Sequence, residues 1–370
     1  MSRVRLRRWG AAIATLLALV AAGVLVTAVL QNRYVVPEAD LFGDGDRDAT
    51  VTPTESPTPE PGADLTGPLN LLLVGIDPRP NQPAWPPHAD AVLILHVPSS
   101  LSRAYLFSLP RDLLVDVPAF EPAGYPGGRT KLTEAMSNGA RVPGQELPDP
   151  AQGFALLAET ISGYTGIERF DAGAVLNFTG FTDLVDAVGG VDIYVDQRVV
   201  SEHRRPDGTQ RTLRPGGGRY LGPQKVYEVG EQHLVGWEAL DYARQRYIEG
   251  SDYARQRHQR QLVKALVAEL FAQDLVTNPV RLDRVLRALG DSLVFDGRGH
   301  RPVDFAFALR RVTANRITLV GLPGSSVFGN RGGYLGEQLA PVAEEFFAAV
   351  REERAGPFLA EHPELREAGG

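Results

Sequence analysis

The chain has 370 residues, a formal net charge of −7 at pH 7 and no cysteine. Without cysteine, the protein has no disulfide, no cysteine-ligated zinc or iron–sulfur site and no thiol nucleophile. The length is enough for one large domain or two, with room for a sizeable hydrophobic core.

The first thirty residues have the pattern of a membrane anchor. Residues 1–10 contain four arginines, and residues 11–30 are uncharged and almost wholly apolar. This apolar run can cross a bilayer as one transmembrane helix, and it exceeds the usual core of a cleavable signal peptide, which is the alternative. The arginines place the N-terminus in the cytoplasm. We therefore predict a single-pass protein of the cell membrane with an extracytoplasmic C-terminal domain.

Residues 31–68 are rich in Pro and Thr and are expected to form an extended linker. Beyond them, continuous apolar runs predict buried strands, and three-and-four spacing predicts amphipathic helices. The strands are expected at 69–74, 91–97, 104–109, 191–195 and 317–322, and the helices at 154–164, 181–188, 282–289, 304–313 and 342–350. We predict an α/β fold, a three-layer α-β-α sandwich with a central mixed sheet. Residues 198–222 should form an exposed loop, and residues 351–370 a polar, frayed end.

An arginine-rich segment at residues 242–261 stands out in this acidic chain. A helix pattern follows Asp252, with a buried stripe that includes Leu262 and Leu266. Traced back toward the start of the helix, the stripe passes through Arg255 and Gln259, so these polar side chains should point into a polar site. The opposite face carries three cations that are expected to be solvated, namely Arg257, Arg260 and Lys264.

Arg244 and Arg246, in the same segment, are separated by one residue. If the chain is extended there, both guanidinium groups lie on the same side. Two neighbouring guanidinium forks suit a diphosphate, because each can bind phosphate oxygens bidentately. A surface network of salt bridges is the alternative, since charge runs are commonly solvated.

Acidic residues stand beside the predicted strands. Asp77 follows the first strand, Asp90 immediately precedes the second, and Arg111 and Asp112 follow the third. If the first two strands are neighbours, Asp77 and Asp90 come from adjacent ends of one sheet, where α/β folds build ligand sites. Two carboxylates suit a hard cation such as Mg²⁺, held partly by water and by a substrate phosphate. The alternative is that each Asp only caps a turn.

These residues, in this order, resemble the LytR-CpsA-Psr family of cell-envelope proteins. The resemblance spans about residues 69–272 and rests on the segments NLLLVGIDPRP at 70–80, HADAVLILHV at 88–97, YLFSLPRDLLVDVP at 105–118, TKLTEAMSNG at 130–139, FTGFTDLVDAVGGVDIYV at 178–195, GEQHLVGWEALDYARQR at 230–246 and SDYARQRHQRQLVKAL at 251–266. Residues 69–272 are accordingly predicted to be the catalytic domain, and residues 273–370 a C-terminal extension of open role.

The resemblance implies an enzyme, a Mg²⁺-dependent phosphotransferase that moves a glycopolymer from a polyprenyl-pyrophosphate carrier onto peptidoglycan, at the muramic acid 6-hydroxyl. It implies that Asp77 and Asp90 bind the metal. The arginines that it implies for pyrophosphate binding are Arg111, Arg244, Arg246 and Arg255. It places Lys131, Asp252 and Gln259 in the same cleft, with Arg79 near the mouth. Asp112 or Asp90 is the candidate to take the hydroxyl proton.

The chain departs from the usual family sequence in two places. His88 stands where members usually have an arginine, and a histidine meets phosphate as a cation only when protonated. In the long helix, His258 and Arg260 replace the usual arginine and glutamine. The His88 departure keeps a second function open, a non-catalytic module that binds polyprenyl-pyrophosphate lipid or cell-wall glycan. A pyrophosphatase that uses the same site with water as the acceptor is a further alternative.

A transcriptional regulator is not expected. The chain is acidic and has no helix-turn-helix with a basic recognition face, so no nucleic-acid partner is predicted.

Overall fold

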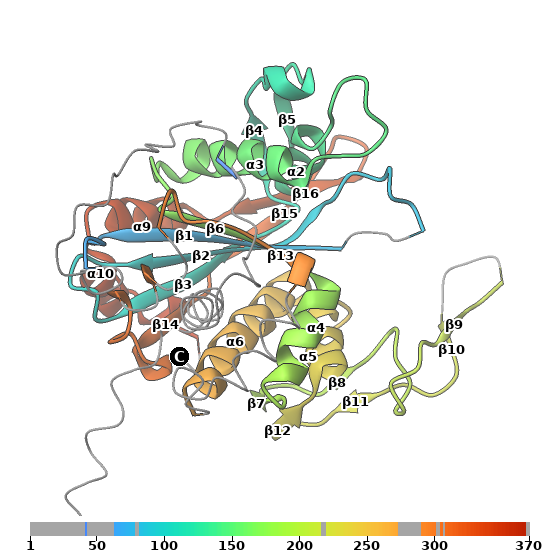
Figure 1. The fold of residues 1–370 in the computed structure, drawn as a ribbon. Helices are drawn as coiled ribbons and strands as arrows, with labels where there is room; N and C mark the ends of the chain where they lie inside the picture. Colours follow the sequence, from blue (N-terminus) through green and yellow to red (C-terminus); the bar gives the residue numbers. More distant parts are fainter. Residues whose placement is uncertain are drawn as a thin grey trace, which may run out of the picture.

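The computed structural model of the chain describes residues 41–42, 63–77, 81–215, 220–272, 290–300, 304–305 and 308–367. Within these residues, the centre of the fold is a six-stranded mixed sheet with helices against both faces (Figure 1). The strand order is β13-β6-β1-β2-β3-β14, formed by β1 (Leu69–Ile76), β2 (Ala89–Val97), β3 (Ala104–Leu109), β6 (Ala172–Asn177), β13 (Leu293–Asp296) and β14 (Ile317–Val320). The predicted α/β fold with a mixed central sheet is confirmed.

Strand β1 lies inside the sheet and is covered on both faces. It pairs antiparallel with β2 and parallel with β6, and β2 pairs antiparallel with β3. Leu71 packs into the core on one side of the sheet, and Leu72 and Val74 pack into the core on the other. Because successive side chains point to opposite faces, a strand covered on both faces is apolar at nearly every position. The strands predicted at 69–74, 91–97 and 104–109 are confirmed.

Two groups of helices complete the layers. One face carries α4 (Phe178–Ala187), α5 (Gly236–Arg244) and α6 (Ser251–Ala272), and the other carries α2 (Leu132–Gly139), α3 (Pro150–Thr165), α9 (Pro341–Arg351) and α10 (Ala355–Glu361). Helix α3 begins after Asp149, whose carboxylate accepts hydrogen bonds from the N–H groups of Ala151 and Gln152, and it ends at Gly166, which has a φ of 69°. These are the usual signals for the start and end of a helix.

Short hairpins and turns surround the sheet. The paired strands are β4 (Leu114–Val117) with β5 (Gly128–Lys131), β7 (Val191–Val195) with β12 (Gly230–Leu234), β8 (Val199–Val200) with β11 (Val226–Tyr227), β9 (Thr212–Leu213) with β10 (Tyr220–Leu221), and β15 (Gly324–Phe328) with β16 (Tyr334–Leu339). The 3₁₀ turns are η2 (Glu121–Ala123), η3 (Gly290–Ser292), η4 (Ala314–Arg316) and η5 (Pro363–Leu365). The segment 198–222, expected to be a loop, contains three two-residue strands among its described residues, namely β8, β9 and β10.

The central sheet continues past residue 272, where the sequence suggested the end of the catalytic domain. Strands β13 and β14 form its two edges, beside β6 and β3. The end of the chain, expected to be frayed, forms α10, and Leu359 and Leu365 are buried there. The helix predicted at 282–289 lies outside the described residues, as does part of the one at 304–313, whereas the one at 342–350 lies within α9.

The predicted transmembrane segment 11–30 also lies outside the described residues. Among those that are described, no helix is long and apolar enough to cross a membrane. Parts of the predicted linker, residues 31–68, pack on the folded domain, and Leu65 within it is buried in the core. The N–H of Leu41 donates to Asp296 at 2.9 Å, and the ring of Phe42 meets that of Phe154 edge-on at 5.5 Å.

We predict that the variant Glu367→Gln is less stable than the wild type by about 3 kcal/mol, because the buried guanidinium of Arg260 loses its carboxylate partner. Denaturant unfolding of the full chain measures this. Glu361→Gln is the control, since Glu361 is an exposed glutamate six positions earlier. Equal stability of the two variants would show that the ion pair does not hold the end of the chain.

Candidate active site

Asp77 and Asp90 lie at the same end of the sheet. Because β1 and β2 are antiparallel, Ile76 at the end of β1 pairs with Ala89 at the start of β2. Asp77 directly follows β1, and Asp90 is the second residue of β2 rather than the residue before it. Both side chains line the same cavity, so the predicted approach of the two carboxylates is confirmed.

Arg244 and Arg246 have the alternation that the sequence predicted. Arg244 is the last residue of α5, and Gln245 is extended, with φ −71° and ψ 129°. The two arginines are exposed, whereas Gln245 is buried. Its side-chain amide donates to Oδ1 of Asp241 at 2.9 Å, and its Oε1 accepts from the N–H of Glu202 at 2.9 Å. Gln245 thus fixes the segment that presents both guanidinium groups to the cavity.

Arg255 and Gln259 point from α6 into the same cavity, as the buried stripe predicted. Arg255 is only 4% exposed, and its Nη2 lies 2.8 Å from Oδ1 of Asp252. Gln259 donates to the carbonyl of Ala243 at 3.5 Å. Asp252 does not line the cavity itself. Its role is to hold the guanidinium group of Arg255.

The opposite face of α6 is more buried than we predicted. Arg260 is 2% exposed, and its guanidinium binds the carboxylate of Glu367, with one contact at 2.8 Å. Nε of Arg257 lies 2.6 Å from Oδ2 of Asp196. The prediction of solvated cations was wrong for Arg260 because the end of the chain covers this face of the helix, and no local pattern in the helix indicates that.

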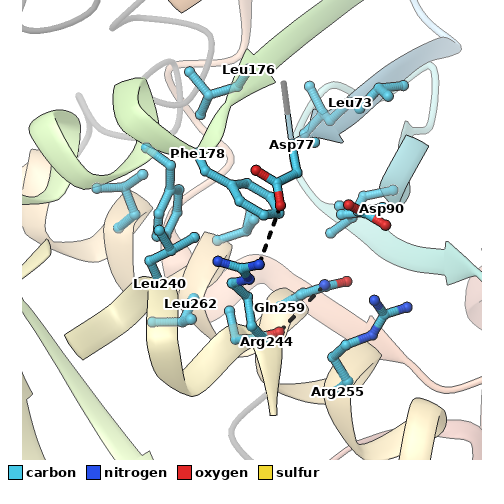
Figure 2. Close-up of a pocket in the computed structure, with 18 of the residues that line it drawn as sticks. Leu73, Asp77, Asp90, Leu176, Phe178, Leu240, Arg244, Arg255, Gln259 and Leu262 are labelled. Carbon is cyan, nitrogen blue, oxygen red and sulfur yellow. Dashed lines mark hydrogen bonds and ion pairs between the residues drawn. The ribbon is translucent and has the colours of Figure 1, made fainter. Parts of the chain in front are cut away.

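The cavity lies between the sheet and helices α4, α5 and α6 and has a volume of about 410 Å³. Figure 2 shows the carboxylate of Asp77 directed at Arg244, with apolar side chains on one side of that arginine and Asp90 and Arg255 on the other. The apolar residues that line it are Leu73, Val74, Ala91, Leu93, Ala174, Leu176, Phe178, Phe181, Leu184, Leu240, Ala243, Leu262, Val263, Leu266 and Leu293. We call this space the apolar cavity.

A second cavity of about 240 Å³ adjoins the apolar cavity. The two share Asp77, Asp90 and Arg111, which therefore mark their junction. The other residues of the second cavity are almost all polar, namely Trp85, His88, Asp112, Lys131, Thr133 and Glu134. Three predicted site residues, His88, Asp112 and Lys131, thus line the second cavity and not the apolar one. Arg79 lies outside the described residues.

Arg111 is bound by carboxylates at the junction. It donates to Oδ1 of Asp90, and its Nε lies 3.5 Å from Oδ1 of Asp112. Burial alone lowers the pKa of Arg111, but the charges of Asp90, Asp112 and Asp252 outweigh burial and raise it above the usual value. The guanidinium group is therefore a permanent positive charge between the two cavities.

At Arg255, the effects that lower the pKa outweigh those that raise it. Burial lowers its pKa, Asp252 opposes that effect, and the charges of Arg111 and Arg246 lower the pKa further. Nε of Arg255 is buried without a hydrogen-bond partner among the described residues. An anion placed between these arginines would relieve their mutual repulsion and supply hydrogen-bond acceptors. The electrostatics of the site therefore favour an anionic ligand.

The donor set at the junction is compatible with Mg²⁺. Within the described part of the chain, no group of three or more His, Cys, Asp or Glu side chains could hold a metal ion. Asp77 and Asp90 face the same space, however, and Mg²⁺ commonly binds through one or two carboxylates together with water and substrate phosphates. The neighbouring arginines would bring such phosphates to the two carboxylates.

Residues far along the chain complete the surroundings of Asp112, and the sequence did not indicate them. The hydroxyl of Tyr334 in β16 lies 3.3 Å from Oδ2 of Asp112 and 2.9 Å from Oε1 of Glu337. Nζ of Lys131 is 3.5 Å from Oδ2 of Asp112 and lies over the ring of Tyr334, 4.8 Å from its centre.

His203 also lines the apolar cavity, and burial and the nearby Arg244 lower its pKa.

The model of the LytR_cpsA_psr family matches residues 43–345. The chain belongs to the LytR-CpsA-Psr family. The match continues far beyond residue 272, in agreement with the two edge strands that the later residues supply.

Relatives in the family are distant in sequence. The cell wall biosynthesis protein LcpA of Corynebacterium glutamicum is 27% identical over 308 residues, 81% of this chain and 54% of LcpA. The polyisoprenyl-teichoic acid–peptidoglycan teichoic acid transferase TagU of Enterococcus faecalis is 25% identical over 259 residues, 69% of this chain and 71% of TagU. The chain thus spans about half the length of LcpA and somewhat over two thirds of TagU.

Solved structures of family members have the same fold. TagV of Bacillus subtilis matches with a TM-score of 0.56 at 20% identity, over 79% of this chain and 98% of TagV. TagT bound to LI-WTA matches with a TM-score of 0.54 at 20% identity, over 80% of this chain and 96% of TagT.

We predict that Arg244→Ala or Arg246→Ala weakens binding of inorganic pyrophosphate by about 10- to 100-fold, because each loses charge-assisted hydrogen bonds of about 1.5 to 3 kcal/mol. Isothermal titration calorimetry measures the affinity. Arg354→Ala is the matched control, since Arg354 is an exposed arginine that lines neither cavity. Unchanged affinity in both site variants would contradict the assignment of this pair to an anion.

Proposed function

We propose that this protein is a membrane-anchored, extracytoplasmic phosphotransferase that moves a glycopolymer from a polyprenyl-pyrophosphate carrier onto peptidoglycan, at the muramic acid 6-hydroxyl. The observation that carries the proposal is the apolar cavity with arginines and carboxylates on one side. The printed names of relatives add support, because TagU is called a transferase of teichoic acid to peptidoglycan.

The apolar cavity suits the carrier lipid. A polyprenyl pyrophosphate has a long hydrocarbon tail and a strongly anionic head, and the cavity offers leucine and phenylalanine side chains next to four arginines. Burial of the tail contributes about 25 cal/mol per Å² of apolar surface removed from water. The guanidinium groups of Arg244 and Arg246 would bind the head, because their planar forks match phosphate oxygens. A ligand with only a hydrocarbon tail, or only a phosphate head, would contact either the apolar residues or the arginines of the cavity, but not both.

The same residues suit phosphoryl transfer. Negative charge develops on the leaving phosphate as its bond to the transferred phosphorus breaks, and fixed cations placed beside that phosphate lower the barrier. Arg111 and Arg255 are such cations, because carboxylate partners and packing already hold them in place. Asp112, next to Arg111, would take the proton of the acceptor hydroxyl.

Asp77 and Asp90 would hold a Mg²⁺ ion at the junction of the two cavities. Such an ion neutralises phosphate charge and orients the pyrophosphate. The ion pairs that these carboxylates make with Arg244 and Arg111 place both acids beside the arginines that would bind the same phosphates.

The N-terminal segments fit a substrate that lies in a membrane. Residues 11–30 would cross the bilayer with residues 1–10 in the cytoplasm, and the linker that follows would keep the domain near the outer surface. A polyprenyl carrier is restricted to that surface, so anchoring the enzyme raises the local concentration of its substrate.

The proposal is tested with the full chain, a polyprenyl-pyrophosphate-linked oligosaccharide and nascent peptidoglycan, with and without Mg²⁺. Metal-dependent appearance of the oligosaccharide on peptidoglycan is expected. Release of carrier phosphate with water as the only acceptor would instead indicate a pyrophosphatase. Tight binding of the lipid without turnover on any acceptor would indicate a binding module.

In this assay, Arg244→Ala and Arg246→Ala are each predicted to abolish transfer while the fold stays intact, because the leaving phosphate loses a stabilising charge. Circular dichroism checks the fold and product analysis checks transfer. Unchanged turnover in either variant would count against the proposed pyrophosphate site.

Asp77→Asn and Asp90→Asn are predicted to reduce transfer by about 100-fold or more at limiting Mg²⁺, because an amide is a much weaker ligand for a hard cation than a carboxylate. Asp116→Asn is the control, since Asp116 is a highly exposed aspartate in β4 that lines neither cavity. The measurement is transfer rate against Mg²⁺ concentration. A metal dependence identical to that of the wild type would remove both acids from the metal site.

A further inference from the structure

The second cavity differs in chemistry from the apolar cavity that it adjoins. It is lined by four carboxylates, by two basic side chains and by one histidine, namely Asp77, Asp90, Asp112, Glu134, Arg111, Lys131 and His88. A polyanion would meet more like charge than opposite charge there. A neutral ligand with many hydroxyl groups fits better, because each hydroxyl can donate to a carboxylate and accept from a cation.

Trp85 adds a flat aromatic surface to this cavity. The residue is 47% exposed, and its ring stacks on that of His88 with centroids 6.1 Å apart and an interplanar angle of 21°. His88 is held in turn, because its Nδ1 lies 3.0 Å from the carbonyl of Pro86 and its Nε2 lies 3.8 Å from Oε1 of Glu134. A supported indole beside charged groups suits a sugar ring, which has an apolar face of C–H groups and a rim of hydroxyls.

The position of the second cavity fits the geometry of phosphoryl transfer, the proposed function on which this inference rests. In displacement at phosphorus, the attacking and leaving oxygens lie roughly in line, on opposite sides of the phosphorus atom. In the proposed function, the tail of the carrier occupies the apolar cavity, so the carrier phosphate would leave on that side. The acceptor must then approach across the junction from the other side, where the second cavity opens.

We infer that the second cavity binds the acceptor glycan, a neutral sugar unit of peptidoglycan, with Trp85 as its stacking surface. The acceptor oxygen forms a bond to the phosphorus that bears the glycopolymer. The bond from that phosphorus to the bridging oxygen breaks, and its electron pair leaves with the carrier phosphate. The hydroxyl proton passes to Asp112, which lines the second cavity and not the apolar one. Trp85 is a binding residue that positions this acceptor.

The test uses the full chain and a peptidoglycan tetrasaccharide whose lactyl carboxyl groups are amidated, so that the probe is neutral. Binding is followed by calorimetry and by tryptophan fluorescence, since Trp85 is one of only three tryptophans in the sequence. The wild type is expected to bind saturably with a change in fluorescence. Trp85→Ala should bind about tenfold more weakly. Trp85→Phe should retain most of the affinity and lose the fluorescence change.

Two controls make the outcome specific. Tyr194→Ala, which removes an exposed aromatic ring on β7 that lines neither cavity, should bind the tetrasaccharide like the wild type. Trp85→Ala should bind inorganic pyrophosphate like the wild type, because Trp85 does not line the apolar cavity.

Three results would overturn the inference: no saturable binding by the wild type, equal tetrasaccharide binding by Trp85→Ala, or loss of pyrophosphate binding in Trp85→Ala. Failure of the proposed function would look different. In that case the tetrasaccharide would bind in a manner that depends on Trp85, but no glycopolymer would be transferred to peptidoglycan.

Discussion

Pairing between acids and arginines is the interaction on which the site depends. Several guanidinium groups gathered at the edge of a hydrophobic space would repel one another and lose hydration, which is costly unless opposite charges lie nearby. Three of the four arginines have an acid close by: Asp77 pairs with Arg244, Asp90 and Asp112 with Arg111, and Asp252 with Arg255. The acids therefore hold the arginines in place before any ligand arrives, and they leave the cluster ready for an anion.

The hydrophobic core and the apolar cavity are parts of one structure. Leu262 and Leu266 of α6 belong to the core on that side of the sheet and also line the cavity, and Arg255 and Gln259 continue the same stripe toward the start of the helix. One helix face thus changes from core to cavity wall to charged site over a few turns. Protein interiors are normally filled to crystal-like density, so a space kept open in this way favours a bound hydrocarbon chain.

The sequence predicted what depends on local periodicity. The strands around Asp77 and Asp90, the inward direction of Arg255 and the alternation at Arg244 each follow from a period of two or of 3.6 residues. Contacts between distant segments were missed. Arg260 meets Glu367 across 107 positions, and Tyr334 reaches Asp112 across 222, and no pattern within either segment indicates its partner. The sequence also did not distinguish the second cavity from the apolar one, because most of the residues that line it were expected in a single cleft. The membrane segment, the metal and the roles of the site residues stay predictions.

The two edges of the sheet have a consequence for how the protein is made. Strands β13 and β14 form the two edges of the sheet, and Glu367 is the partner of Arg260. Both strands and Glu367 come after residue 292. A nascent chain that already contains all the arginines of the site still has two open sheet edges and an unpaired buried cation. Native pairing of such late segments adds contacts between distant residues, which slows folding and prolongs exposure of strand edges. Completion of the fold is thereby linked to synthesis of the residues after 292.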